Sequence, residues 1–156
     1  MRTLLIAAAL AAGAVPFVAH AAGAMEVLRP WSRPAVAGTN GVGYMVLANH
    51  GRKADALEKV ESPLAARVEM QARSMAGGVM SMKAQAKVPI PAGGETTFGP
   101  GAYHLMFIGL TKTLKPGDQA PATLSFASGA KVSVRFRVSD GVGPPPIELN
   151  LWADPL

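Results

Sequence analysis

Two short patterns in the sequence place histidine and methionine side chains where they could share one metal ion. His104 and Met106 lie two residues apart in GAYHLMFIGL, and Met80 and Met82 lie two apart in GVMSMKAQ. Alternate residues of an extended chain point to the same face, so each pair shares a face if these segments are strands. Thioether sulfur and imidazole nitrogen suit Cu(I), whereas Ca²⁺ and Mg²⁺ prefer oxygen. The alternative is a core histidine packed among methionines, which commonly fill core space.

Few other residues could support a chemical function. The sequence has 3 histidines, 8 methionines and no cysteine, so any soft-metal site must use methionine and histidine. His50 lies in the turn-like segment NHGRK, where we expect an exposed side chain outside the site unless that loop folds over it. Nucleophilic catalysis is not indicated, because the sequence has neither a cysteine nor a G-x-S-x-G segment. Phosphate-binding loops and paired-carboxylate motifs are missing too. We therefore expect a carrier and not an enzyme.

The first 24 residues have the layout of a secretory signal peptide. Arg2 precedes a short apolar run, and small residues follow it, so that cleavage is expected near Ala21 or Ala24. The run is short for a membrane span and contains a proline. We therefore expect an exported, periplasmic protein whose mature chain is soluble and has no membrane span.

The charge of the chain does not point to nucleic acid. The net charge is +5, and loss of Arg2 with the signal peptide leaves 5 − 1 = +4. The basic residues are scattered and partly alternate with apolar ones, as in KVSVRFRV. Such a pattern is typical of a solvated strand face, so we expect no nucleic-acid partner.

Alternating segments predict that the candidate site lies on β-strands. Residues 131–138 alternate apolar and polar positions strictly, and residues 123–127 do the same, with the turn SGA between them. Gly77-Gly78 gives a further hairpin signal between two candidate strands. Roughly seven or eight short strands with turns between them predict one all-β domain over residues 25–138, a sandwich or Greek-key barrel.

The composition changes after this domain. Residues 139–156 contain three successive prolines, which favour an extended and unpaired backbone. We interpret them as a proline-rich tail. Its segment IELNLW either docks as an edge strand or moves freely.

Longer segments of the chain resemble the periplasmic copper chaperones of the PCuAC family. The resemblance covers roughly residues 26–138 and rests on NGVGYMVLANHG, AARVEMQARSMAGGVMSMKAQ, IPAGGETTFGPGAYHLMFIGL and LKPGD. It implies a cupredoxin-like β-sandwich that binds Cu(I) and, in several bacteria, supplies the copper-A centre of cytochrome c oxidase. The implied partner is a copper acceptor, either subunit II of that oxidase or another copper chaperone. A monomer is expected.

The ligand pattern of this family can be placed on the chain by its spacing. The pattern is a His or Met, then a Met, then His-x-Met. In this chain 21 residues separate Met82 from His104, and 10 residues separate Gln71 from Met82, as the family spacing requires. The resemblance therefore implies Met82, His104 and Met106 as copper ligands, with Gln71 at the position of the usual histidine.

Gln71 leaves three alternatives open, because an amide oxygen is a hard donor and suits Cu(I) poorly. Copper binds with three ligands only. Alternatively, Met70, Met75 or Met80 supplies a fourth ligand, although Met70 should face away from Gln71 on a regular strand. In the third alternative, tight copper binding has been lost, and the domain is a metal-free structural or protein-interaction module. If copper binds, we expect a lower affinity than in a four-ligand relative.

Overall fold

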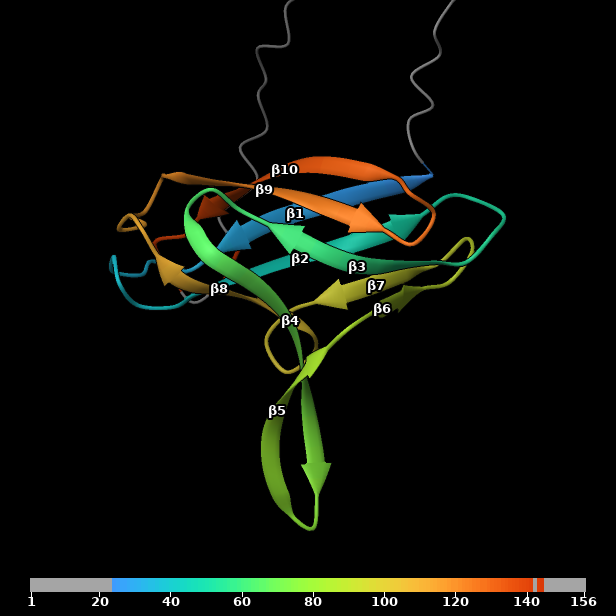
Figure 1. Ribbon diagram of the computed structural model, residues 1–156, viewed down its shortest axis with the longest axis horizontal. Helices are drawn as coiled ribbons and strands as arrows, with labels where there is room; N and C mark the ends of the chain where they lie inside the picture. The colour runs from blue at the N-terminus through green and yellow to red at the C-terminus, as the bar shows by residue number, and fades with distance from the viewer. Residues whose placement is uncertain (1–23, 142, 145–156) are drawn as a thin grey trace, which may run out of the picture.

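The computed structural model describes residues 24–141, 143 and 144, and its regular elements are all β-strands (Figure 1). Most of the predicted signal peptide and residues 145–156 of the predicted tail lie outside the described residues. Among the residues described, no helix is long and apolar enough to cross a membrane. The strands are β1 Met25–Ser32, β2 Gly41–Asn49, β3 Asp55–Glu61, β4 Ala65–Ala76, β5 Val79–Gln85, β6 Val88–Ile90, β7 Glu95–Phe98, β8 His104–Leu110, β9 Gln119–Phe126 and β10 Lys131–Val138.

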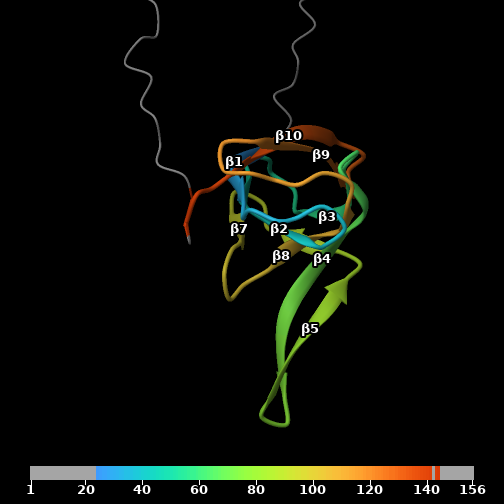
Figure 2. The same ribbon diagram turned by 90° about the vertical axis from the view of Figure 1, so that its left-hand side faces the viewer.

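One continuous sheet curls over on itself and encloses the core. The strand order is β5-β4-β8-β2-β1-β10-β9-β3-β6, and β7 pairs with β2. Strands β9 and β10 form the upper part of the molecule in Figures 1 and 2, and β7 and β8 lie below them. Strand β1 joins the two layers, because it pairs with β2 on one side and with β10 on the other. The predicted all-β sandwich is confirmed.

Aromatic side chains from both layers meet in the core. Phe107 of β8 and Phe136 of β10 are fully buried, and their rings meet edge to face with centroids 5.6 Å apart. The alternation predicted for β10 places Val134 and Val138 in the core beside Phe136. Gly43 of β2 permits this close packing, since a Cβ atom there would lie 2.7 Å from Cε2 of Phe107. The core therefore fixes β8, the strand that carries His104 and Met106.

The described residues form ten strands, more than the seven or eight that the sequence predicts, and two regions differ from the expectation in particular. Strand β1 has an irregular alternation because Arg29 has a φ of 47° and the register with β2 shifts between Leu28 and Trp31. The strand is nevertheless central, and its Trp31 packs on Tyr44 with ring centroids 4.6 Å apart. Strand β9 begins at Gln119, four residues before the alternating segment 123–127 that the sequence predicts. Tertiary pairing overrides the weak local signal at both places.

The hairpin of β4 and β5 projects from the sandwich as an arm (Figures 1 and 2). Strand β4 pairs with β8 only as far as Gln71, and beyond that residue it pairs with β5 alone. The arm, residues 72–84, ends in the two-residue turn Gly77-Gly78, which joins the paired residues Ala76 and Val79. Both glycines have positive φ, 60° and 76°, as a tight hairpin turn with the right-handed twist requires.

Candidate metal site

A tight turn positions His104 as the first residue of β8. The backbone N–H of Gly99 donates to the Tyr103 carbonyl at 2.8 Å, and that of Ala102 donates to the Gly99 carbonyl at 3.0 Å. Gly101 supplies the positive φ of 85° that this turn needs. His104 therefore enters the sheet at a fixed register, at the foot of the arm.

Cross-strand pairing brings three of the predicted site residues to one face of the sheet. His104 lies opposite Gln71, and Met106 lies opposite Glu69. Directly opposite residues of antiparallel strands share a face, and so do alternate residues of one strand. Leu105 points the other way and is fully buried in the core. Gln71, Glu69, His104 and Met106 thus form a group outside the core, which we call the base site.

Met82 reaches the same face from β5. It pairs with Arg73, which is two residues from Gln71 on β4, so Met82 and Gln71 point to the same side. Met82 lies two strands away from His104 and two residue pairs further out along the arm. Strand spacing and rise then give roughly 12 Å between the two Cα atoms, a span that both side chains can bridge through one metal ion. The side chain of Met82 is half exposed.

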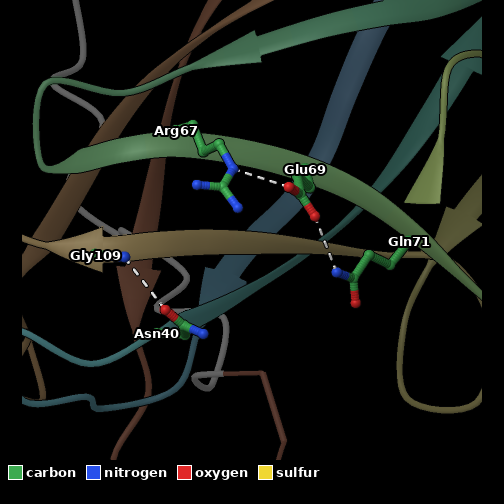
Figure 3. Close-up of polar contacts among 5 residues, drawn as sticks. All are labelled: Asn40, Arg67, Glu69, Gln71 and Gly109. Carbon is green, nitrogen blue, oxygen red and sulfur yellow. Dashed lines mark hydrogen bonds and ion pairs between the residues drawn. The ribbon is translucent and has the colours of Figure 1, made fainter. Parts of the chain in front are cut away.

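Gln71 is held by hydrogen bonds on both sides. Its Oε1 lies 3.3 Å from Nε2 of His104, and its Nε2 donates to Oε2 of Glu69 at 3.3 Å. The other carboxylate oxygen of Glu69 accepts a hydrogen bond from Nε of Arg67 at 2.9 Å. Figure 3 shows Arg67, Glu69 and Gln71 in a row along β4. Because the Gln71 amide donates to Glu69, its oxygen is turned toward the imidazole.

The electrostatics of the base site favour a neutral imidazole. Burial lowers the pKa of His104, and a hydrogen bond to the Ala102 backbone opposes this effect more weakly. The pKa of the Glu69 carboxyl is lowered by hydrogen bonds from Arg67 and Gln71, so this group stays ionised. A histidine must be unprotonated to bind a metal ion, and the surroundings of His104 therefore prepare it for that role.

Other residues considered from the sequence lie elsewhere. Met70 is buried in the core on the opposite face of β4, so the structure does not bring it to the base site. Met80 shares the face of Met82 but lies closer to the tip of the arm and is half exposed. His50 is exposed beyond the end of β2, where its Nε2 lies 2.7 Å from Oε2 of Glu26.

Sequence reasoning missed the roles of Glu69 and Arg67. The only available signal was the alternation R-x-E-x-Q, which places the three side chains on one face of a strand. Within the part of the chain that the structure describes, no group of three or more His, Cys, Asp or Glu side chains could hold a metal ion. A metal site at this position therefore depends on thioether ligands.

Comparisons with known proteins agree with this architecture. The LpqE-like lipoprotein family matches residues 25–138, and the chain belongs to that family. A search of curated proteins found no match. The copper-bound PCuAC domain from PmoF2 is similar to this chain at 23% identity, with a TM-score of 0.64, over 75% of this chain and 93% of that domain.

Two further solved structures are similar. The apo PCuAC domain of PmoF2 shares 22% identity, with a TM-score of 0.65, over 80% of this chain and 96% of that one. Cu(I)-bound DR1885 from Deinococcus radiodurans shares 26% identity, with a TM-score of 0.58, over 74% of this chain and 80% of that protein. The chain therefore has the cupredoxin-like fold of PCuAC domains, as the sequence predicts.

Proposed function

We propose that this protein is a periplasmic copper carrier that holds Cu(I) with Met82, His104 and Met106 and passes it to an acceptor protein. The observation that carries the proposal is the shared face of β4, β5 and β8, on which a buried, neutral histidine lies among methionines. Two of the similar structures are described as copper-bound, which supports the same function. Export would follow removal of residues 1–24.

The chemistry of the three ligands fits cargo transfer better than catalysis. Thioether sulfur selects Cu(I) over Mg²⁺, which prefers oxygen ligands. Met82 is half exposed and Met106 is only partly buried, so an acceptor can replace the ligands one at a time from the open side of the sheet. Copper then moves without being released into solution. The resemblance to PCuAC chaperones favours subunit II of cytochrome c oxidase, which holds the copper-A centre, or another copper chaperone as the acceptor.

Gln71 decides the number of ligands. Its amide oxygen suits Cu(I) poorly, and it occupies the side of His104 where relatives of the PCuAC type often have a histidine. Met70 is excluded as a replacement by its burial on the other face of β4. We therefore favour a site with three ligands, in which Gln71 gives up its contact with Nε2 of His104 when the ring binds copper.

A metal-free interaction module is the second candidate, and one observation favours it. Hydrogen bonds already link Arg67 to Glu69, Glu69 to Gln71 and Gln71 to His104 without a metal ion. In that case the histidine is a structural residue. The thermal stability of the protein would then be independent of Cu(I).

Competition for Cu(I) separates the two candidates. The purified protein is loaded under reducing conditions and titrated with a chromogenic Cu(I) chelator. A carrier should retain copper, and His104→Ala should lose that retention because the only nitrogen ligand is removed. His50→Ala is the matched control, since it removes the other histidine of the described residues, far along β2 from the base site. No retained copper, or equal retention by His104→Ala, would contradict the proposed function.

A further inference from the structure

The methionines of the described residues fall into two groups. Three are buried in the core, and the other four lie on the face of β4, β5 and β8 that carries the base site. The core group is Met25, Met45 and Met70, and the other group is Met75, Met80, Met82 and Met106. Core methionines need no functional explanation, because methionine packs well in irregular space. The second group does need one, since three of its members are among the most exposed apolar side chains.

The exposed methionines gather at the tip of the arm. Met75 is 66% exposed, Met80 52% and Met82 50%. The described residues contain only two other large apolar side chains of comparable exposure, Val36 and Val79, and Val79 is also on the arm. Apolar side chains concentrated on a projecting hairpin are costly in water and indicate a binding function.

Strand pairing places the thioethers within reach of one ion. Met75 and Met80 are directly opposite each other, and Met82 follows Met80 on the same face. The Cβ atoms of such an opposite pair are about 5 Å apart. Two sulfur atoms bound to one ion at about 2.3 Å each lie at most roughly 4.6 Å apart, so the pair can close on an ion by side-chain rotation alone. The Gly77-Gly78 turn fixes this pairing.

We propose that Met75 and Met80, with Met82 as a third ligand, form a second soft-metal site at the tip of the arm, which we call the tip site. Its ligand is Cu(I) or another soft monovalent ion. Residues 72–85 contain no Asp, Glu or His, so a hard cation finds no anionic oxygen and Zn²⁺ finds no imidazole. The serine pair Ser74 and Ser81 lies on the opposite face of the hairpin.

Met82 connects the tip site with the base site. Met82 lies on the same face as Met80, which is nearer the tip, and as Gln71 and His104, which are nearer the sandwich. An ion captured at the exposed tip can therefore pass to His104 without leaving Met82. This transfer step rests on the proposed function, whereas metal binding at the tip site does not.

Methionine methyl NMR tests the tip site in the intact protein. Ag(I) serves as a probe of soft-metal binding that does not change oxidation state, and it is added to protein labelled with ¹³C at the methionine methyl groups. The signals of Met75 and Met80 should shift together within two equivalents of Ag(I). Those of Met25, Met45 and Met70 should stay in place as internal controls, because they are buried in the core. Unchanged Met75 and Met80 signals would overturn the proposal and leave the tip as a protein-contact surface.

A double substitution gives an independent measurement. When both sites are filled, Met82 belongs to the base site and the tip ion is held by Met75 and Met80. Met75→Leu with Met80→Leu keeps two exposed apolar side chains but removes both of these sulfurs, so the bound Ag(I) should fall from two equivalents to one. Val79→Leu, at the tip on the other face, should keep two. Shifts of the Met75 and Met80 signals without any change of the Met106 signal would refute the base site and leave the tip site standing. The reverse result would refute the tip site alone.

Discussion

Replacing Gln71 by histidine should convert the base site into a tighter Cu(I) site. Gln71 lies directly opposite His104 in the sheet, and its Oε1 is already 3.3 Å from Nε2 of that ring. An imidazole at position 71 starts from the same Cβ position and points to the same face. It replaces a hard amide oxygen by a nitrogen donor that suits copper. The substitution therefore adds a fourth ligand without moving the backbone.

The expected gain in copper affinity can be compared with the expected loss of stability in the apo protein. Gln71→His removes two hydrogen bonds of a partly exposed side chain, each worth about 0.5–1.5 kcal/mol in the apo protein. Changes in the groups that merely orient metal ligands alter affinity by about 10–100-fold, and a direct ligand should contribute at least as much. That range corresponds to about 1.4–2.7 kcal/mol of binding free energy. The two lost hydrogen bonds together amount to about 1–3 kcal/mol of apo stability, which is comparable with the expected gain in copper affinity.

The assay is chelator competition for Cu(I), combined with chemical denaturation of the apo protein. Gln71→His should bind copper at least about tenfold more tightly than the original chain. Gln85→His is the matched control, because Gln85 pairs with Met70 and lies on the opposite face of the same hairpin. It should leave the affinity unchanged. An equal gain in both variants, or no gain in Gln71→His, would refute the geometry of the base site.

Four further outcomes are expected. Because burial lowers the pKa of His104 below its ordinary value of 6.5, the unfolded chain takes up this proton at a higher pH than the folded protein. Thermal stability should therefore fall as the pH drops from about 6.5 through the lowered pKa of His104. It should fall by less in His104→Gln, and an equal fall in both proteins would contradict this explanation. Cu(I) at 100 times its dissociation constant should stabilise the protein by about 2.7 kcal/mol in thermal melts, and His104→Ala should abolish the shift. Gly43→Ala should cost about 1–3 kcal/mol in chemical denaturation, since its Cβ would lie 2.7 Å from Phe107. Phe136→Ala should cost about 3–5 kcal/mol in the same assay, because the ring is fully buried against Phe107.

The sequence predicted most of the fold because the alternation of apolar residues is strong where the core is formed. Strand β10 begins and ends as its alternation predicts. Strand β1 escaped prediction because Arg29 adopts a positive φ and the pairing register shifts there. Its place between β2 and β10 is set by partners far away in the sequence, which local patterns do not reveal.

The candidate site was only partly predictable from the sequence. The resemblance to PCuAC chaperones implies Met82, His104 and Met106 through the spacing of the family's ligands, whereas alternation alone places only His104 and Met106 on one face. The sequence could not show that Glu69 anchors Gln71, because this contact depends on the rotamers of two side chains and on the position of Arg67. Nor could it show that the arm leaves its methionines exposed, since exposure depends on where β8 begins.

In the proposed carrier, the position opposite His104 would control how firmly copper is held. With glutamine there, the imidazole has a hydrogen-bonding partner in the apo state, and copper must displace that contact before it binds. The contact between Gln71 and His104 forms again when copper leaves, so it favours the release of copper to the same extent that it disfavours binding. A carrier must bind its cargo less tightly than the acceptor does, and a three-ligand site with a half-exposed Met82 meets this condition more easily than a four-ligand site. Gln71 is therefore compatible with a function in transfer, and the Gln71→His variant should accept copper more tightly but deliver it more slowly. Stopped-flow transfer to a chelator would measure this rate, and faster delivery by the variant would contradict the argument.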